Sequence, residues 1–227
     1  MKKLSILLIT LLMVNGVIAQ SCLPQGIIFT IQSQIDNFQI NYPNYTQIEG
    51  SVTISGSDIA NLNGLSVLTS IGGWLWIQYN DILPGLTGLN SLNSTGGGVW
   101  IYKNNSLTNL TGLENLTSIG QDLGIAVNRS LINLTGLNAL TTIGGDIDIS
   151  GCEALINMTG LNNVTSVGGF LNIESNTSLP DLTGLNNLTS IGRYIRIYGN
   201  NTLSSLTGID SINAFSITDL NSLAIIL

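Results

Sequence analysis

Apolar residues recur along this chain at a fixed interval of 24 residues. Two of the recurring positions lie two residues apart with a variable position between them, and this period of 2 is typical of a β-strand. The first position holds Leu75, Val99, Leu123, Ile147, Leu171 and Ile195. The second holds Ile77, Ile101, Ile125, Ile149, Ile173 and Ile197. The pattern predicts a short strand in each repeat.

Glycine keeps the same interval, at Gly64, Gly88, Gly112, Gly136, Gly160, Gly184 and Gly208. A helical repeat needs about 34 residues, and the segments between the strands are rich in Asn, Thr and Gly, which are poor helix formers. We therefore predict an all-β fold, a right-handed parallel β-solenoid whose coils stack about 4.8 Å apart. Residues 46–214 are expected to form about seven coils, because stacking is what buries the apolar side of each coil.

Residues 20–45 precede the solenoid and are expected to cap its first coil. Thr30 is a candidate helix N-cap, and Pro43 ends the segment. Between them, four residues have helical spacing: Ile31, Ile35, Phe38 and Tyr42. The sequence thus predicts a short amphipathic helix over the first coil.

Residues 215–227 are expected to form an incomplete last coil, as in a truncated chain or one whose open end is covered by something else. Its apolar residues are Leu220, Leu223, Ile225, Ile226 and Leu227. Solenoids need polar caps at their ends to stay soluble. The pattern therefore predicts end-to-end self-association.

Residues 1–19 have the pattern of a signal peptide. Lys2 and Lys3 precede an apolar run over residues 4–14, and a small residue, Ala19, offers a cleavage site. The run is shorter than the 20 or so residues of a membrane span, and the residues before Cys22 make a poor lipoprotein signal. We expect cleavage after Ala19, no membrane insertion afterwards, and a secreted or cell-surface protein.

A polar column follows the predicted strands, at Asn80, Asn104, Asn128, Asn176 and Asn200, with Cys152 in the equivalent position. A buried Asn at a corner can bond backbone groups that would otherwise lack partners. We interpret the column as structural. The same argument makes Cys152 a small core residue and not a nucleophile.

Charge and composition exclude several classes of function. The net charge is −7, and losing Lys2 and Lys3 would leave four basic residues against 13 acidic ones, or −9. Nucleic acids and anionic membranes both require a basic surface. The chain has no histidine, which removes Ser-His-Asp and Cys-His catalysis. We expect no metal and no cofactor.

Carboxylates are the remaining candidates for catalysis. Asp146 and Asp148 flank a core position and are expected to point outward, near Asp122 and Glu174. Polysaccharide-cleaving enzymes exist on parallel β-helices, so this acidic face leaves an enzyme as an alternative. The other interpretation is solvated surface charge, which we favour.

The motifs "LTSIGG", "L-x-I-x-x-N" and "L-T-G-L", together with the N-terminal segment from Cys22, resemble the receptor L-domain-like, leucine-rich-repeat-type modules of secreted bacterial proteins. The resemblance covers about residues 22–211. It implies recognition or adhesion at a bacterial outer surface and not catalysis. Relatives usually pair the cysteine at Cys22 with one near Tyr45, and the tyrosine here leaves the state of Cys22 open.

The outward strand positions hold the candidate binding site. Trp74 and Trp76 are expected to project about 7 Å apart on one face, with Trp100 about 4.8 Å from Trp76 on the next coil and Tyr102 beyond it. Clustered exposed aromatic residues usually mark an interface, and Trp and Tyr are enriched at binding hot spots. The alternative is an aromatic ladder that only stiffens the sheet, or a platform covered by the N-terminal segment.

We therefore expect a non-catalytic module that binds a glycan or a protein on this face. Two other classes stay open besides the enzyme. The first is an ice-binding solenoid, suggested by a column of threonines at Thr87, Thr111, Thr135, Thr159, Thr183 and Thr207. The second is a structural spacer without any ligand.

Overall fold

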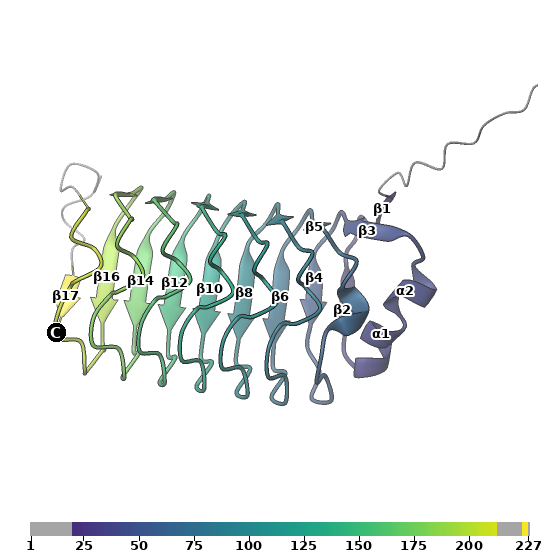
Figure 1. Ribbon diagram of the computed structural model, residues 1–227, viewed down its shortest axis with the longest axis horizontal. Helices are drawn as coiled ribbons and strands as arrows, with labels where there is room; N and C mark the ends of the chain where they lie inside the picture. The colour runs from purple at the N-terminus through teal and green to yellow at the C-terminus, as the bar shows by residue number, and fades with distance from the viewer. Residues whose placement is uncertain (1–19, 213–223, 227) are drawn as a thin grey trace, which may run out of the picture.

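The computed structural model describes residues 20–212 and 224–226 (Figure 1). The predicted signal peptide, residues 1–19, lies outside the described residues. So does most of the predicted last coil, of which only 224–226 are described. Within the described part of the chain, no helix is both long enough and apolar enough to cross a membrane.

The chain forms a parallel β-solenoid with two sheets that run along its length, as predicted. One sheet has nine strands, in the order β17-β16-β14-β12-β10-β8-β6-β4-β2. Their bounds are β2 Ile27–Phe29, β4 Val52–Ile54, β6 Leu75–Gln78, β8 Val99–Tyr102, β10 Leu123–Ala126, β12 Ile147–Ser150, β14 Leu171–Glu174, β16 Ile195–Tyr198 and β17 Ala224–Ile226. The six strands of this sheet from β6 to β16 are the ones that the period-2 columns predict, and Figure 1 shows the strands stacked from coil to coil.

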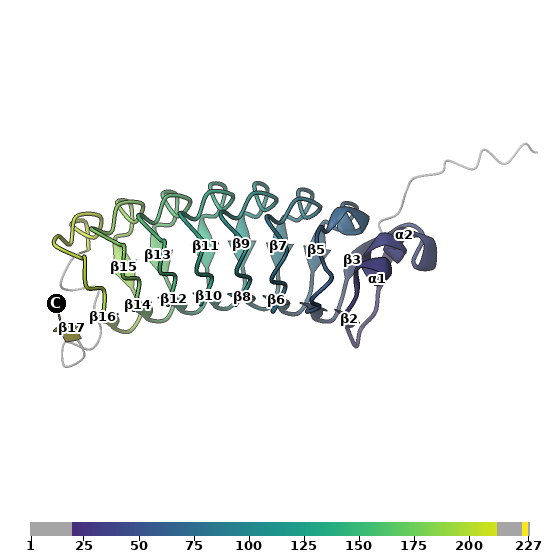
Figure 2. The same ribbon diagram turned by 90° about the horizontal axis from the view of Figure 1, so that it is seen from below.

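The second sheet has eight shorter strands, in the order β1-β3-β5-β7-β9-β11-β13-β15. Their bounds are β1 Gln20–Cys22, β3 Tyr45–Ile48, β5 Ser70–Ile71, β7 Ser94–Thr95, β9 Ser118–Ile119, β11 Thr142–Ile143, β13 Ser166–Val167 and β15 Ser190–Ile191. Most are only two residues long, too short for alternation to show in the sequence. Figure 2 shows the two sheets as separate sides of the coil, joined by turns on the remaining side.

The register is in phase over the central coils. Leu123 pairs with Val99 on one side and with Ile147 on the other, so identical positions of neighbouring repeats lie side by side. The inward side chains of both sheets and of the turns are buried in one continuous core. Each apolar column of the sequence is therefore a ladder of packed side chains that runs through the core.

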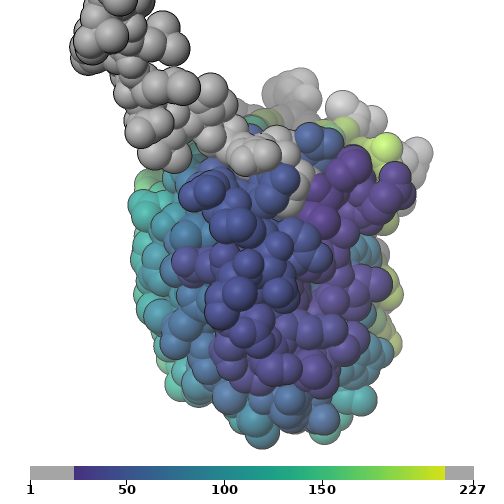
Figure 3. All heavy atoms as spheres, turned by 90° about the vertical axis from the view of Figure 1, so that its right-hand side faces the viewer, coloured from purple at the N-terminus to yellow at the C-terminus, as the bar shows by residue number. Residues whose placement is uncertain are grey.

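The N-terminal segment forms a coil of its own and carries two short helices in place of one. β1 pairs with β3 and β2 with β4, while α1 (Gln32–Asp36) and α2 (Phe38–Asn41) lie at the end of the solenoid (Figure 1). Figure 3 shows the N-terminal residues spread over this end. A 3₁₀ helix, η1 (Asn63–Leu65), contacts both helices. Ile35 and Phe38 are fully buried, so the segment covers the first coil.

The predicted N-cap at Thr30 is wrong by one residue. Ile31 is the N-cap, and its side chain is 45% exposed instead of facing the core. The side chain of Gln34 accounts for this start, because its Oε1 accepts hydrogen bonds from the backbone N–H groups of Thr30, at 2.6 Å, and Ile31, at 3.3 Å. Gln34 is at position N3, and it bonds the backbone N–H of the N-cap residue as the glutamine of a capping box does.

From Gly88 to Gly208 the glycine column forms a tight corner in each coil. Gly136 has φ +117°, and a Cβ atom there would lie 2.0 Å from the carbonyl oxygen of Leu110 in the preceding coil. Both the dihedral angle and the close approach of two backbones require a residue without a side chain. The 24-residue spacing of glycine is thus the repeat of this corner.

The asparagine column is a buried hydrogen-bond ladder. Each side-chain oxygen accepts the backbone N–H of the column residue in the preceding coil, as Asn128 does from Asn104 at 2.9 Å. Each amide nitrogen donates to a strand carbonyl of the preceding coil, as Asn128 does to Ile101 at 2.8 Å. The five asparagines are at most 6% exposed, so the ladder fastens each coil to the one before it.

Cys152 interrupts this ladder. Its thiol is free and fully buried, and burial raises its pKa to about 12 although hydrogen bonds from Asn128 act in the opposite direction. The sulfur lies 3.7 Å from the Ile125 carbonyl oxygen, whereas the amide of Asn176 bonds the matching Ile149 carbonyl at 2.9 Å. The coil of Cys152 is therefore held less firmly than its neighbours.

We expect Cys152→Asn to raise the free energy of unfolding by about 1 kcal/mol, because the amide restores a hydrogen-bond donor and a stronger acceptor to a buried position. Cys152→Ala is the matched control, since it also removes the thiol but supplies no polar group. Urea denaturation followed by circular dichroism measures both variants. Equal stability of the two variants would contradict the proposed weak point.

Candidate ligand-binding face

The outward face of the nine-stranded sheet carries most of the chain's aromatic residues. All three tryptophans project from it, near β6 and β8, and all are half-buried. Tyr102 lies on the same face at the end of β8. The structure thus brings together Trp74, Trp76, Trp100 and Tyr102, which we call the tryptophan patch.

The indole rings of the patch form a contact chain. The ring centroids of Trp74 and Trp76 are 5.3 Å apart with an interplanar angle of 23°. The rings of Trp76 and Trp100 follow at 6.0 Å and 47°. The first pair is stacked and the second tilted, so the three rings make one continuous apolar surface across two coils.

Two glycines allow the indoles to lie against the sheet. A Cβ atom on Gly124 would lie 1.8 Å from Cε3 of Trp100, and one on Gly98 would lie 2.3 Å from Cζ3 of Trp74. Trp74 and Trp100 therefore each cover the glycine of the next coil, and part of each of these rings is used in packing. The remaining exposed part offers a flat apolar surface with little conformational freedom.

Tyr79 and Lys103 extend the patch, and the sequence pattern does not reveal them. The ring of Tyr79 contacts Tyr102 edge-on at 5.3 Å, and Nζ of Lys103 lies 5.3 Å from the Tyr79 ring centroid. Both residues follow their strands with φ of 58° and 53°. This left-handed turn breaks the alternation, so a period of 2 does not show which face they join. Tyr79 is 46% exposed.

Two of the candidate carboxylates are engaged with the backbone. Oδ1 of Asp122 accepts the N–H of Asp146 at 2.8 Å, and Oδ1 of Asp146 accepts the N–H of Phe170 at 2.8 Å. Both side chains are half-buried instead of standing freely outward. The side chains of Asp122 and Asp146 thus link neighbouring coils by hydrogen bonds. Of the four candidate carboxylates, Asp148 and Glu174 remain for contact with a ligand.

A pocket of about 400 Å³ opens on the same face over β12, β14 and β16. The residues of its wall that bear on binding are Asp148, Phe170, Asn172, Glu174, Tyr194 and Arg196. It is hollow because short side chains, those of Asp148 and Ser150, stand next to longer ones on the following two coils. We call it the polar pocket.

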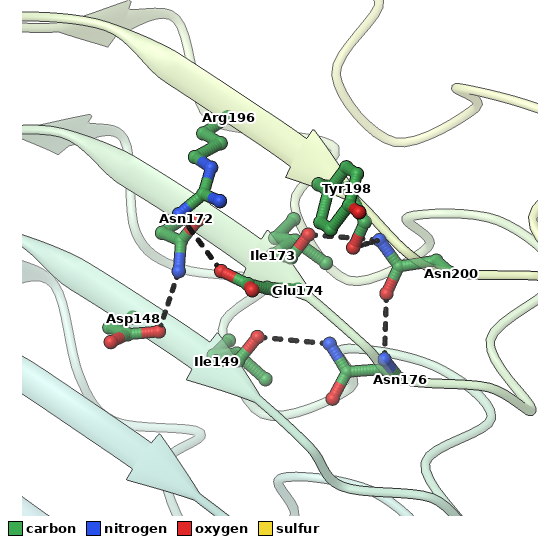
Figure 4. A network of polar contacts seen from close by, with 9 residues as sticks. All are labelled: Asp148, Ile149, Asn172, Ile173, Glu174, Asn176, Arg196, Tyr198 and Asn200. Atoms are coloured by element: carbon green, nitrogen blue, oxygen red, sulfur yellow. Dashed lines mark hydrogen bonds and ion pairs between the residues drawn. The ribbon is translucent and has the colours of Figure 1, made fainter. Parts of the chain in front are cut away.

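The polar pocket combines a stacked aromatic pair with paired polar groups, and Figure 4 shows the polar pairs, Asn172 with Asp148 and Arg196 with Glu174. The rings of Phe170 and Tyr194 stack at 5.0 Å with an interplanar angle of 11°. Arg196 Nη1 lies 2.9 Å from Glu174 Oε2, and the guanidinium lies 5.6 Å from the Tyr198 ring centroid. This ion pair is partly exposed and contributes little to stability, so its arrangement matters more for what it presents to a ligand.

Asn172 is the most unusual group in the polar pocket. It is only 8% exposed, its Nδ2 donates to Asp148 Oδ1 at 2.9 Å, and its Oδ1 has no hydrogen-bond partner. The orientation follows from charge, because the carboxylate accepts hydrogen bonds and repels the amide oxygen. A buried acceptor without a partner costs about 1–3 kcal/mol.

Among the described residues, one other buried side-chain atom lacks a partner, Oδ1 of Asn105. Its Nδ2 also donates to an aspartate of the preceding coil, Asp81, at 2.7 Å. Asn105 lies on an exposed turn and does not line a pocket with aromatic walls. The combination of an unpartnered acceptor and a hollow therefore belongs to Asn172.

A scan against protein-family models, a search of curated proteins and a search of solved structures find no match for this chain.

Proposed function

We propose that the protein is a secreted or cell-surface, non-catalytic module that binds a glycan or a protein on the outward face of the nine-stranded sheet. The observation that carries this proposal is the contact chain of Trp74, Trp76 and Trp100 on a rigid scaffold. Flat aromatic surfaces with polar borders are typical of sugar-binding and protein-binding sites. The polar side chains on the neighbouring coils favour a glycan.

Features of the sequence support the location. The signal-peptide pattern of residues 1–19 indicates export, and the resemblance to receptor L-domain-like modules favours a recognition role at a bacterial surface. The net charge of −7 argues against nucleic acids and anionic membranes as partners. The acidic balance thus favours uncharged or basic partners over anionic ones.

The non-catalytic part of the proposal rests on the carboxylates. Two of the four candidates bond the backbone of the next coil, and a third, Glu174, pairs with Arg196. A polysaccharide-cleaving enzyme on this face would depend on Asp148 or Glu174. Release of reducing ends from a polysaccharide bound by the wild type would argue for that alternative.

The paired substitution Trp76→Ala with Trp100→Ala tests the proposal. We expect the affinity for a glycan identified on an array to fall at least about tenfold, because these rings would supply the flat contact surface. Ile132→Ala with Ile156→Ala is a matched control, since both are exposed apolar residues on turns outside the sheet. Circular dichroism checks that each variant is folded.

The opposite pattern would show that the patch is structural. Since the rings are half-buried, the paired variant is expected to lose some stability as well. If the melting temperature falls while the affinity is unchanged, the tryptophans act as an aromatic ladder and the proposal is wrong. A chain that binds nothing on glycan and protein arrays would support the spacer alternative.

A further inference from the structure

The polar pocket has the composition of a sugar subsite separate from the tryptophan patch. Its wall combines hydrogen-bond acceptors, a guanidinium donor and an aromatic pair within one hollow of about 400 Å³. We propose that it binds one uncharged pyranose residue. This inference deepens the proposed function by assigning a second site and a class of sugar, and it rests on a glycan being the ligand.

The acceptors of the pocket are arranged for ligand hydroxyls. Asp148 uses Oδ1 to hold the amide nitrogen of Asn172, which leaves Oδ2 for a donor from the ligand. The same contact turns Oδ1 of Asn172 away from the carboxylate, buried and unpartnered. In Figure 4, Asn172 lies between Asp148 and Arg196. A hydroxyl of a sugar ring can donate to Oδ2 of Asp148, whereas Oδ1 of Asn172 is buried behind the pocket wall and does not face the ligand.

The donor of the pocket is the guanidinium of Arg196. One of its nitrogens, Nη1, is held by Glu174, and a guanidinium carries five N–H groups, so others remain for a ligand oxygen. The ion pair also fixes the direction of the side chain. A sugar hydroxyl both donates and accepts, and it can therefore bond an acceptor and this donor at once.

The aromatic pair supplies the apolar contact that a pyranose needs. Phe170 and Tyr194 stack on each other from neighbouring coils, and both are half-buried in the pocket wall. The C–H groups of a sugar ring can pack against them while its hydroxyls bond the polar residues. An ion or a small polar molecule would leave this apolar wall without a partner.

The charge of the pocket wall selects against anionic ligands. The wall carries two carboxylates, Asp148 and Glu174, and one guanidinium, which gives a local charge of about −1, and the chain is acidic. An acidic or sulfated sugar would be repelled. Among the described residues, no group of three or more acidic, Cys or His side chains is placed to hold a metal ion. An uncharged pyranose fits best.

The test uses the exported full chain and a set of monosaccharide probes. The uncharged probes are the methyl glycosides of glucose, galactose and mannose, and N-acetylglucosamine; the charged ones are glucuronic acid, glucosamine and calcium chloride. Titration is followed by NMR, with assigned side-chain NH₂ resonances of Asn172. We expect at least one uncharged sugar to bind saturably and to shift these resonances, and glucuronic acid and calcium not to bind there.

Three variants locate the site. Asp148→Asn keeps the shape and an acceptor for Asn172 but removes the charge, and Asn172→Leu removes both polar atoms. We expect each to weaken binding of the sugar roughly tenfold, because Asp148 then loses either its charge or the amide contact that fixes its direction. Glu174→Gln, which releases Arg196, should also weaken it. The matched control is Glu153→Gln, which breaks an equivalent exposed pair with Arg129 outside the pocket.

Each outcome decides between the sites. Binding that survives the paired tryptophan variant and Glu153→Gln, and is weakened by Asp148→Asn, supports the pocket. Binding lost only in the tryptophan variant overturns this inference and leaves the proposed function standing. The inference is also overturned if the only probes that bind are the acidic sugar, glucosamine or calcium. It is overturned as well if no uncharged probe shifts the side-chain NH₂ resonances of Asn172. Asp148→Asn keeps the test valid if Asn172→Leu fails to fold.

Discussion

Gly136→Ala is expected to lower the free energy of unfolding by about 4 kcal/mol or more, because it combines backbone strain with a steric clash. A φ of +117° lies outside every region that alanine occupies comfortably. The new Cβ atom would also lie 2.0 Å from the Leu110 carbonyl oxygen, so two backbones would have to separate. Because coils contact only their neighbours, the damage would reach the coils on both sides of the corner.

Gly85→Ala is the control for that substitution. The nearest heavy atom to a Cβ at Gly85 is the Thr111 carbonyl oxygen, at 3.8 Å, and the residue does not have a positive φ. Urea denaturation followed by circular dichroism compares the two variants with the wild type. Equal unfolding midpoints for Gly136→Ala and Gly85→Ala would show that the corner adapts to a side chain at little cost.

Asn128→Ala is expected to lower the free energy of unfolding by about 3 kcal/mol, because several buried polar groups would lose their hydrogen-bond partners at once. Oδ1 of Asn128 accepts from the N–H and from Nδ2 of Asn104, at 2.9 and 3.2 Å. Its Nδ2 donates to the carbonyls of Ile101 and Ala126, at 2.8 and 3.1 Å. Asn128 is fully buried, so these groups have no contact with bulk solvent that could replace the lost hydrogen bonds.

The control for the ladder is Asn115→Ala, which removes an exposed asparagine that makes one side-chain bond, to the Asn90 carbonyl. We expect that substitution to lower the free energy of unfolding by less than about 1 kcal/mol. Thermal melting measures both variants, and hydrogen exchange of the Asn104 amide reports the ladder locally. If the Asn104 amide stays as protected in Asn128→Ala as in the wild type, the ladder does not hold the coils together.

The fold could be predicted from the sequence because one pattern repeats in phase. The apolar columns that end at Ile195 and Ile197 each place one core residue in every coil. The register of the strands follows the same 24-residue interval. The N-cap at Thr30 was wrong because a side chain a few residues later, that of Gln34, decides where the helix starts. A hydrogen bond from one side chain to the backbone near a helix start is a local feature, and it leaves no periodic signal in the sequence.

The candidate site was only partly predictable. Alternation places Trp76, Trp100 and Asp148 on one face, and the structure has them there. The polar pocket depends on differences in side-chain length between coils and on the orientation of the Asn172 amide. Both are three-dimensional properties of non-repeating residues, which a search for periodicity overlooks.

The in-phase register also makes the molecule a ruler. Trp100 and Asp148 occupy the same position in coils two repeats apart, so about 10 Å separates their strands, in steps of about 4.8 Å per coil. Gain or loss of one 24-residue unit between them would change this spacing by one step and leave both surfaces intact. A change in the number of coils between the two surfaces could thus fit the protein to ligands whose binding groups lie at different distances. The residues that contact the ligand would stay the same.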